Sequence, residues 1–325
     1  MLKKTIRRLG ALAMVLAMAV SVFAVNASAA VSAELFKVYT TTATTTPKED
    51  LTMKLQSSSA TDLRVDSTIK ADNIPAITLT KDKTSDKFVI GNLDALNDIG
   101  NFHYVFKEED AGTAGVVYYT GEVYVDVLCS YGTTGAIEQS VVVYTKKGEE
   151  KTESITNAFN AGKLTVSKDV AGSLGDKTKT FTVEVKFNTT KTVRNDITYT
   201  VGNENKTISA GENGWTGTQT VRIDLKHGES ITFNNVPYDV TYSVAEESYA
   251  ADGYKATYKL NSADPTDTAV SDESMDSATE TVAITNTKNG STPTGVIMPI
   301  APYALMVVLA GAFAVVFLTR RNRAE

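Results

Sequence analysis

Apolar and polar residues alternate with a period of two along most of this chain. Because successive side chains of a β-strand point to opposite faces, this alternation predicts strands with one buried face. Long stretches with helical periodicity are missing, and Gly-containing turn signals separate the runs. Short strands at this spacing predict an all-β fold made of β-sandwiches. The clearest runs are Leu51/Met53/Leu55, Val123/Val125/Val127, Phe181/Val183/Val185/Phe187 and Val221/Ile223/Leu225.

The N-terminus has the pattern of an export signal. Several basic residues precede the apolar run of residues 9–25, and the run is followed by Ala27, Ser28 and Ala29. Small residues at these places match the pattern that signal peptidase accepts. We therefore expect residues 1–29 to be a signal peptide, cleaved between Ala29 and Ala30. A retained N-terminal membrane anchor is the alternative.

The C-terminus predicts a membrane segment. Residues 296–318 carry no charge, and the run exceeds the roughly 20 residues that cross a hydrocarbon core. Arginines follow it directly, so residues 296–325 are expected to be a transmembrane helix with a basic cytoplasmic tail. Pro293, Thr294 and Gly295 stand immediately before the run, at the end of a linker formed by residues 289–295.

This order of Pro-Thr-Gly, apolar span and basic tail resembles a sortase sorting signal. Compared with the usual Leu-Pro-x-Thr-Gly pattern, the chain keeps only Thr294 and Gly295, and Pro293 takes the variable place. The resemblance implies that a sortase cysteine attacks the Thr294 carbonyl, releases Gly295 with the membrane tail, and passes the threonyl group to an amine. The acceptor would be a peptidoglycan precursor or a neighbouring pilin subunit. A turn before a plain tail anchor is the alternative.

The composition excludes several classes of function. The formal net charge is −6 at pH 7, and it becomes more negative once the basic ends are removed, which argues against a nucleic-acid partner. The only cysteine, Cys129, has apolar neighbours, so it predicts a small buried side chain. The only histidines, His103 and His227, lie far apart. We therefore predict no metal site, no cofactor and no enzymatic nucleophile with its base.

Three polar residues in the second part of the chain fall in the apolar register of their own strands. Lys168 continues the face of Leu164 and Val166, Glu246 follows Tyr242 and Val244, and Asn286 follows Val282 and Ile284. We expect Lys168, Glu246 and Asn286, here called the second triad, to point inward.

The first part of the chain repeats this arrangement with Lys37, Glu108 and Asn157, here called the first triad. Lys37 lies between Leu35 and Tyr39, although both faces of its strand are apolar. The Lys and Asn of each triad are about 120 residues apart, and each part ends on Ile-Thr-Asn. The repeated order indicates an internal duplication.

Burial gives such a triad a specific chemistry. Desolvation lowers the pKa of an amine and raises that of a carboxyl, so the amine can act as a neutral nucleophile. Attack on the Asn side chain would give a Lys-Asn isopeptide bond with loss of ammonia, with the Glu polarising the amide and moving protons. A hydrogen-bonded Lys-Glu pair beside an Asn is the alternative. Lys163 and Lys186 are expected to face outward.

The whole mature chain resembles a Gram-positive surface pilin built from self-crosslinking, immunoglobulin-like domains. Residues 34–159 resemble the pilin isopeptide-linkage domain, and residues 163–288 resemble a collagen-adhesin B-type domain. The resemblance implies two tandem sandwiches, at residues 30–160 and 161–288. It also implies that Lys37 bonds to Asn157 assisted by Glu108, and Lys168 to Asn286 assisted by Glu246. The matching segments are Gly100-x-Phe102-x-Tyr104-x-Phe106-x-Glu108, Gly115-Val116-x-Tyr118, Ile155-Thr156-Asn157, Leu164-Thr165-Val166-Ser167-Lys168, Gly228-Glu229-Ser230, Tyr242-Ser243-Val244-Ala245-Glu246 and Ile284-Thr285-Asn286.

The expected function is structural: a pilin-like subunit or a wall-anchored stalk at the cell surface. The Tyr-Pro-Lys pilin motif is absent, so the acceptor lysine stays open among Lys48, Lys163 and the pair at 146–147. A monomeric adhesin is the alternative, with a host or matrix ligand bound by the loop around Trp215 or by acidic residues 262–279. Residues 40–46 and 262–279 are both expected to be surface loops. An exported enzyme finds no support.

Overall fold

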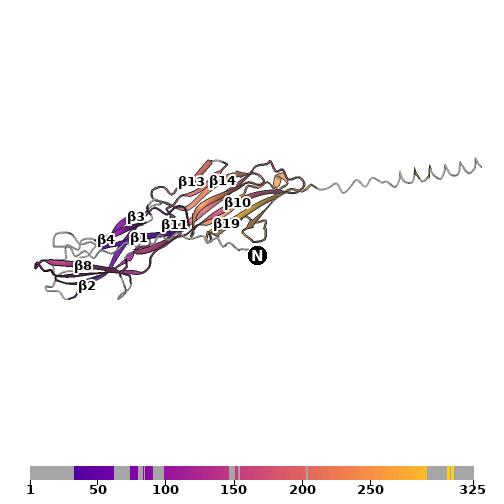
Figure 1. The fold of residues 1–325 in the computed structure, drawn as a ribbon. Helices are drawn as coiled ribbons and strands as arrows, with labels where there is room; N and C mark the ends of the chain where they lie inside the picture. The colour runs from indigo at the N-terminus through magenta and orange to yellow at the C-terminus, as the bar shows by residue number, and fades with distance from the viewer. Residues whose placement is uncertain are drawn as a thin grey trace, which may run out of the picture.

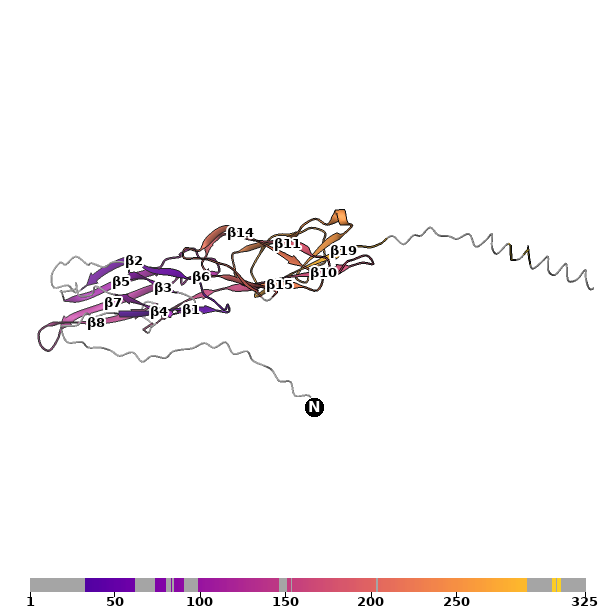
Figure 2. The same cartoon turned by 90° about the horizontal axis from the view of Figure 1, so that it is seen from above.

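The computed structural model of the protein is elongated, with the strands of the first half at one end and those of the second half at the other (Figures 1 and 2). It describes residues 33–61, 74–79, 83, 85–90, 99–145, 151–152, 154–202, 204–290, 306–307 and 309–310. The expected signal cleavage site at Ala29 and Ala30 and the sorting motif of Pro293, Thr294 and Gly295 lie outside these residues. In the described part of the chain, no helix is long and apolar enough to cross a membrane.

Two sheets form the first half. One has the strand order β4-β1-β9-β6 and the other β3-β2-β5-β7-β8. The strands are β1 (Ala33–Thr41), β2 (Glu49–Thr61), β3 (Ile74–Leu79), β4 (Ser85–Ile90), β5 (Gly100–Glu108), β6 (Val116–Val117), β7 (Glu122–Tyr131), β8 (Ile137–Tyr144) and β9 (Ser154–Phe159).

Two further sheets form the second half, with the orders β13-β12-β15-β10-β19-β17 and β14-β11-β16-β18. The prediction of an all-β fold is confirmed. The elements are β10 (Ala161–Ala171), β11 (Phe181–Val193), β12 (Ile197–Val201), β13 (Glu204–Ile208), β14 (Trp215–Leu225), β15 (Ser230–Pro237), β16 (Thr241–Glu246), the short 3-10 helix η2 (Ala250–Asp252), β17 (Lys255–Leu260), β18 (Val270–Ser274) and β19 (Thr279–Thr287).

The first and last strands of each half are parallel neighbours. In β1 and β9, Lys37 pairs with Ile155, two residues before Asn157. In β10 and β19, Lys168 pairs with Ile284, two residues before Asn286. Because side chains alternate along a strand, an offset of two returns the Asn to the face that the Lys occupies. The two halves therefore repeat the same register.

Each half has its own apolar core, built from the alternating residues of its strands. Leu51 and Met53 are buried in the first core, and Val183 and Val185 in the second. Residues from both sheets of each half belong to its core, as in a β-sandwich. The predicted alternation is confirmed at these positions.

One stretch differs from its prediction as a surface loop. Residues 262–279 contain β18 (Val270–Ser274), which pairs with β16. Val270 is largely buried and Met275 fully buried in the second core. These two apolar side chains hold the acidic stretch against the sheet. The density of acidic residues therefore did not predict where the stretch lies. Residues 40–46 begin at the end of β1 and continue as bends.

The two halves meet through backbone hydrogen bonds. Asn160, the only residue between β9 and β10, donates from its N–H to the Gly115 carbonyl (2.8 Å) and accepts from the Tyr238 N–H (3.0 Å). The Ala114 N–H donates to the Thr192 carbonyl (2.9 Å), and the Ala114 side chain packs in the core of the second half. The segment before β6 therefore belongs physically to both halves.

Candidate functional site

Three elements of the first half bring the first triad together. Lys37 comes from the middle of β1, Asn157 from the adjacent strand β9, and Glu108 from the last position of β5 in the opposite sheet. The side chains of Lys37 and Glu108 are both 0% exposed, and Asn157 is also fully buried. The Lys37 side chain therefore points inward, as the alternation along its strand predicted.

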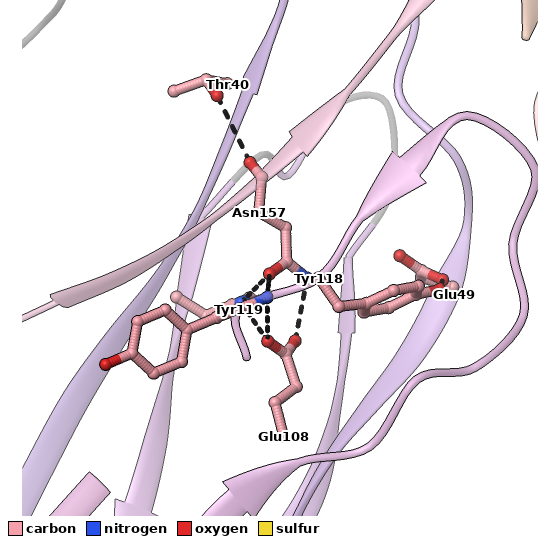
Figure 3. Close-up of polar contacts among 7 residues, drawn as sticks. Thr40, Glu49, Glu108, Tyr118, Tyr119 and Asn157 are labelled. Atoms are coloured by element: carbon pink, nitrogen blue, oxygen red, sulfur yellow. Dashed lines mark hydrogen bonds and ion pairs between the residues drawn. The ribbon is translucent and has the colours of Figure 1, made fainter. Parts of the chain in front are cut away.

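Glu108 contacts both groups that would exchange a proton, and Figure 3 shows its carboxyl beside the Asn157 amide. Its Oε2 atom accepts from Lys37 Nζ at 2.6 Å, and its Oε1 atom accepts from Asn157 Nδ2 at 2.8 Å. Lys37 Nζ is also 2.5 Å from Asn157 Oδ1. The carboxyl thus bridges the amine and the amide nitrogen, while the amine lies beside the amide carbonyl.

The orientation of the Asn157 amide follows from a backbone donor. The Tyr119 N–H donates to Asn157 Oδ1 at 2.7 Å. A backbone N–H can only donate, so the amide atom facing it must be the oxygen. The nitrogen is then directed at Glu108. This backbone contact fixes which atom of the amide receives protons and which accepts hydrogen bonds.

Burial is the main influence on the lysine of the first triad. Desolvation lowers the pKa of Lys37 below its ordinary value, and the charge of Glu108 opposes this only in part. Because its pKa is lowered, the Lys37 amine loses its proton more readily than the amine of a lysine in water. A neutral amine has the lone pair that nucleophilic attack requires.

The second triad has the same origin in the fold. Lys168 comes from β10, Asn286 from the parallel neighbour β19, and Glu246 from the last position of β16 in the opposite sheet. Asn286 Nδ2 donates to Glu246 Oε2 at 2.5 Å. Lys168 Nζ lies 2.7 Å from Glu246 Oε1, with side-chain exposures of 0% and 1%.

The contacts of the second lysine are less regular. Lys168 Nζ is close to Glu246 Oε1, but the two groups are not aligned as a hydrogen bond. Neither atom has a hydrogen-bond partner among the described residues. Lys168 Nζ lies 4.3 Å from the centre of the Phe181 ring. Burial lowers the pKa of Lys168, with Glu246 opposing the shift. The second amine is thus held as an ion pair against an aromatic face.

A third buried carboxyl was missed from the sequence. Glu49 is 2% exposed, and its Oε2 atom accepts from the Tyr118 hydroxyl (2.6 Å) and the Thr113 hydroxyl (2.5 Å). Burial raises the pKa of Glu49. Glu49 precedes Leu51 and shares its face of β2, so the register rule that found the triads also applies here.

Neither triad contains Lys163, Lys186, His103 or His227, and the lysine pair at 146–147 lies outside the described residues. Lys163 and Lys186 are exposed, as their registers predicted. His103 Nδ1 contacts Asp126 at 2.9 Å, and His227 Nδ1 accepts from the Val170 N–H at 3.1 Å. Among the described residues, no group of His, Cys, Asp and Glu side chains could hold a metal ion. Cys129 is fully buried, as expected.

Trp215 is a core residue. It opens β14, pairs with Val193 and is 8% exposed within the core of the second half. A buried ring is not available to a ligand. The Trp215 ring itself is therefore largely shielded from a ligand, while residues 211–213 and 216–218 on either side of it are exposed.

Parts of the chain are similar to known proteins. Residues 162–288 match the model of a family described as "Domain of unknown function (DUF7601)". A pilin of Streptococcus pyogenes serotype M1 is 29% identical over 238 residues, covering 69% of this chain and 68% of the relative. This chain is similar to Gram-positive pilins. The resemblance predicted from the sequence is confirmed at this level.

Solved pilin structures have the same fold. The major pilin of Streptococcus pyogenes superposes with a TM-score of 0.57 at 19% identity, over 81% of this chain and all of that one. The major pilin T3.2 of Streptococcus pyogenes serotype GAS13637 gives a TM-score of 0.55 at 22% identity, over 80% of this chain and 98% of that one. The likeness spans both halves of the molecule.

Proposed function

We propose that this protein is a structural subunit of a Gram-positive surface pilus, with one isopeptide bond closing each of two domains. The domains are residues 30–160 and 161–288. The observation that carries the proposal is the contact of Glu108 with both Lys37 Nζ and Asn157 Nδ2. The similarity to pilins supports the structural role. The two glutamates act once, on their own chain, so the protein is not an enzyme.

The reaction in the first triad follows from its contacts. Lys37 gives a proton to Glu108, and the neutral Nζ atom attacks Cγ of Asn157. Glu108 then gives that proton to Nδ2, the Cγ–Nδ2 bond breaks, and ammonia leaves. A second proton passes from Nζ to Glu108, which leaves the new amide neutral. One C–N bond forms and one breaks, so no oxidant or external group is needed. Proximity within the packed core supplies much of the rate.

The second triad can react by the same route. Asn286 Nδ2 donates to one oxygen of Glu246, and Lys168 Nζ forms an ion pair with the other oxygen. The same carboxyl can therefore take a proton from the attacking amine and give one to the departing amide nitrogen. The same parallel register relates Lys and Asn in both halves. The repeat of order, register and partners supports the same product in each domain.

The proposed bonds have a mechanical consequence. Each bond joins the first strand of a domain to the last, so tension that enters at Lys37 passes to Asn157 without loading residues 38–156. The residues between remain folded because force bypasses their hydrogen bonds. A stalk without disulfides gains covalent continuity in this way, which suits an extracellular fibre.

Attachment is proposed to occur at Thr294. A sortase would cleave between Thr294 and Gly295 and join the threonyl group to a neighbouring subunit or a peptidoglycan precursor. The precursor tail would hold the chain in the plasma membrane until then. Replacing Thr294 with Ala should leave the protein in membrane fractions and abolish boiling-resistant ladders on denaturing gels. Ladders that persist in this variant would contradict the assignment.

Intact mass tests the isopeptide bonds. Chains of residues 30–294 should weigh two ammonias less than their sequence, about 17 Da for each bond. Glu108→Ala and Glu246→Ala should each lose one ammonia only. A mass equal to the sequence would contradict the reaction and leave both triads as buried polar groups.

A further inference from the structure

The two triads differ at the oxygen of the amide under attack. In the first triad, the Tyr119 N–H donates to Asn157 Oδ1 at 2.7 Å and also reaches Glu108 Oε2 at 3.2 Å. In the second triad, Asn286 Oδ1 is buried and has no hydrogen-bond partner among the described residues. Figure 3 shows the Tyr119 backbone facing the side chains of Asn157 and Glu108.

The segment that carries this N–H is anchored on both sides. On one side, β6 pairs with β9, placing Val117 opposite Ala158, next to Asn157. On the other side, the Tyr118 hydroxyl donates to the buried carboxylate of Glu49. The Tyr119 N–H therefore has a fixed direction before any reaction starts.

We propose that the Tyr119 backbone N–H is an oxyanion donor for bond formation in the first domain, and that Glu49 and Tyr118 position it. This inference rests on the proposed isopeptide chemistry. When Lys37 Nζ adds to Cγ of Asn157, the C=O bond opens and negative charge develops on Oδ1. A donor already 2.7 Å from that oxygen stabilises the charge without reorganisation. Glu108 remains the proton shuttle, and Tyr119 contributes no proton.

With the Tyr119 N–H in place, Glu108 has to transfer protons but does not also have to polarise the Asn157 carbonyl. Both Glu108 oxygens are engaged, one by Lys37 Nζ and one by Asn157 Nδ2. Lys37 Nζ, which also lies 2.5 Å from Asn157 Oδ1, is the attacking group, so polarisation of the carbonyl during attack falls to the backbone. This differs from the expectation that the glutamate itself polarises the amide. Removing one preorganised donor of this kind slows acyl transfer by roughly 10²- to 10³-fold.

The test removes the N–H and keeps the side chain. Residue 119 is replaced by the α-hydroxy acid analogue of tyrosine during cell-free synthesis of residues 30–294, which turns the amide into an ester. Samples are quenched at intervals, and ammonia loss is followed by mass. The first-domain bond should form about 10²-fold more slowly, while the second-domain bond forms at its normal rate in the same molecules. The matched control is Tyr119→Phe, which keeps the N–H and should keep the rate.

A second variant covers the case in which the ester chain does not fold. Tyr118→Phe removes the hydroxyl that contacts Glu49 and leaves every backbone N–H in place. It should slow the first-domain bond severalfold and leave the second unchanged. First-domain rates equal to wild type in the folded ester chain would overturn the inference, as would a normal rate in Tyr118→Phe where the ester chain is unfolded. A wild-type chain that loses no ammonia would instead overturn the proposed function.

Discussion

Lys37 Nζ lies 2.6 Å from Glu108 Oε2, and both side chains are fully shielded from solvent. Taking two charges out of water costs several kcal/mol per ion, which their mutual attraction repays only in part. Transfer of a proton to Glu108 removes both charges, and bond formation then makes the neutral state permanent. The free-energy cost of keeping these two charges buried therefore favours proton transfer and bond formation.

Replacing Glu108 with Gln should block the first bond and destabilise the first domain. The amide cannot take a proton from Lys37, and the buried amine loses its counter-charge. We expect a fall in Tm of at least about 10 °C, from a loss of roughly 4 kcal/mol or more, measured by calorimetry beside intact mass. Glu109→Gln is the control, because that side chain is 44% exposed and should change Tm little. Equal Tm values would contradict the role of Glu108.

Lys168→Met removes the second bond together with the ion pair of Lys168 and Glu246. Met has similar length and no charge, so it removes the crosslink without leaving an unpaired buried amine. Closing a loop of this size is worth about 4 to 5 kcal/mol through the unfolded chain. We expect that loss in unfolding free energy by denaturant titration. Lys163→Met, on the exposed face of the same strand, should lose less than about 0.5 kcal/mol. Similar losses in both would argue against a crosslink at Lys168.

The stability of a chain that cannot form the first bond should depend on pH through Lys37. In Asn157→Ala the amine stays free, and burial lowers its folded pKa below the ordinary 10.5. Between these pKa values the unfolded chain binds a proton that the folded chain does not, so stability rises with pH. The gain should reach about 1.4 kcal/mol per pH unit and stop above 10.5.

Urea titrations at several pH values measure this slope. The same background carrying Lys37→Met lacks the titrating amine, and the difference between the two curves isolates it. The difference should shrink as the pH rises toward 10.5. Parallel curves would mean that Lys37 is protonated equally in the folded and unfolded chains.

Gly115→Ala should loosen the junction between the two halves. Gly115 has φ of +75°, and an added Cβ would lie 2.4 Å from the Asn160 carbonyl oxygen. Both the backbone conformation and the contact exclude a side chain, so we expect a loss of about 1 to 3 kcal/mol. Small-angle scattering should show a wider range of molecular lengths. Gly135→Ala is the control, because it has a similar φ but no atom within 4 Å.

The sequence predicted the side chains of the two triads well because strand alternation is a local rule. Lys168, placed by Leu164 and Val166, needed no knowledge of its partners. Glu49 obeys the same rule beside Leu51, so it could have been found. Position in the apolar register thus reveals buried charges, but it does not reveal which of them meet.

Other features depend on long-range contacts. The Tyr119 N–H carries no residue signature, since every residue except proline has one, and its direction depends on β6 meeting β9. The strand at Val270 escaped notice because acidic and Ser/Thr residues around it suggest a loop. Its burial depends on pairing with β16, where Val244, 26 residues earlier, is its partner.

Peptide mapping distinguishes a crosslinked triad from an unreacted one, because it locates each bond. The mature protein is digested under denaturing conditions, and the fragments are sequenced by tandem mass spectrometry. We expect one branched species joining the Lys37 and Asn157 peptides and another joining those of Lys168 and Asn286, each lighter by one ammonia than the sum of its parts. Four linear peptides with unmodified side chains would contradict this expectation.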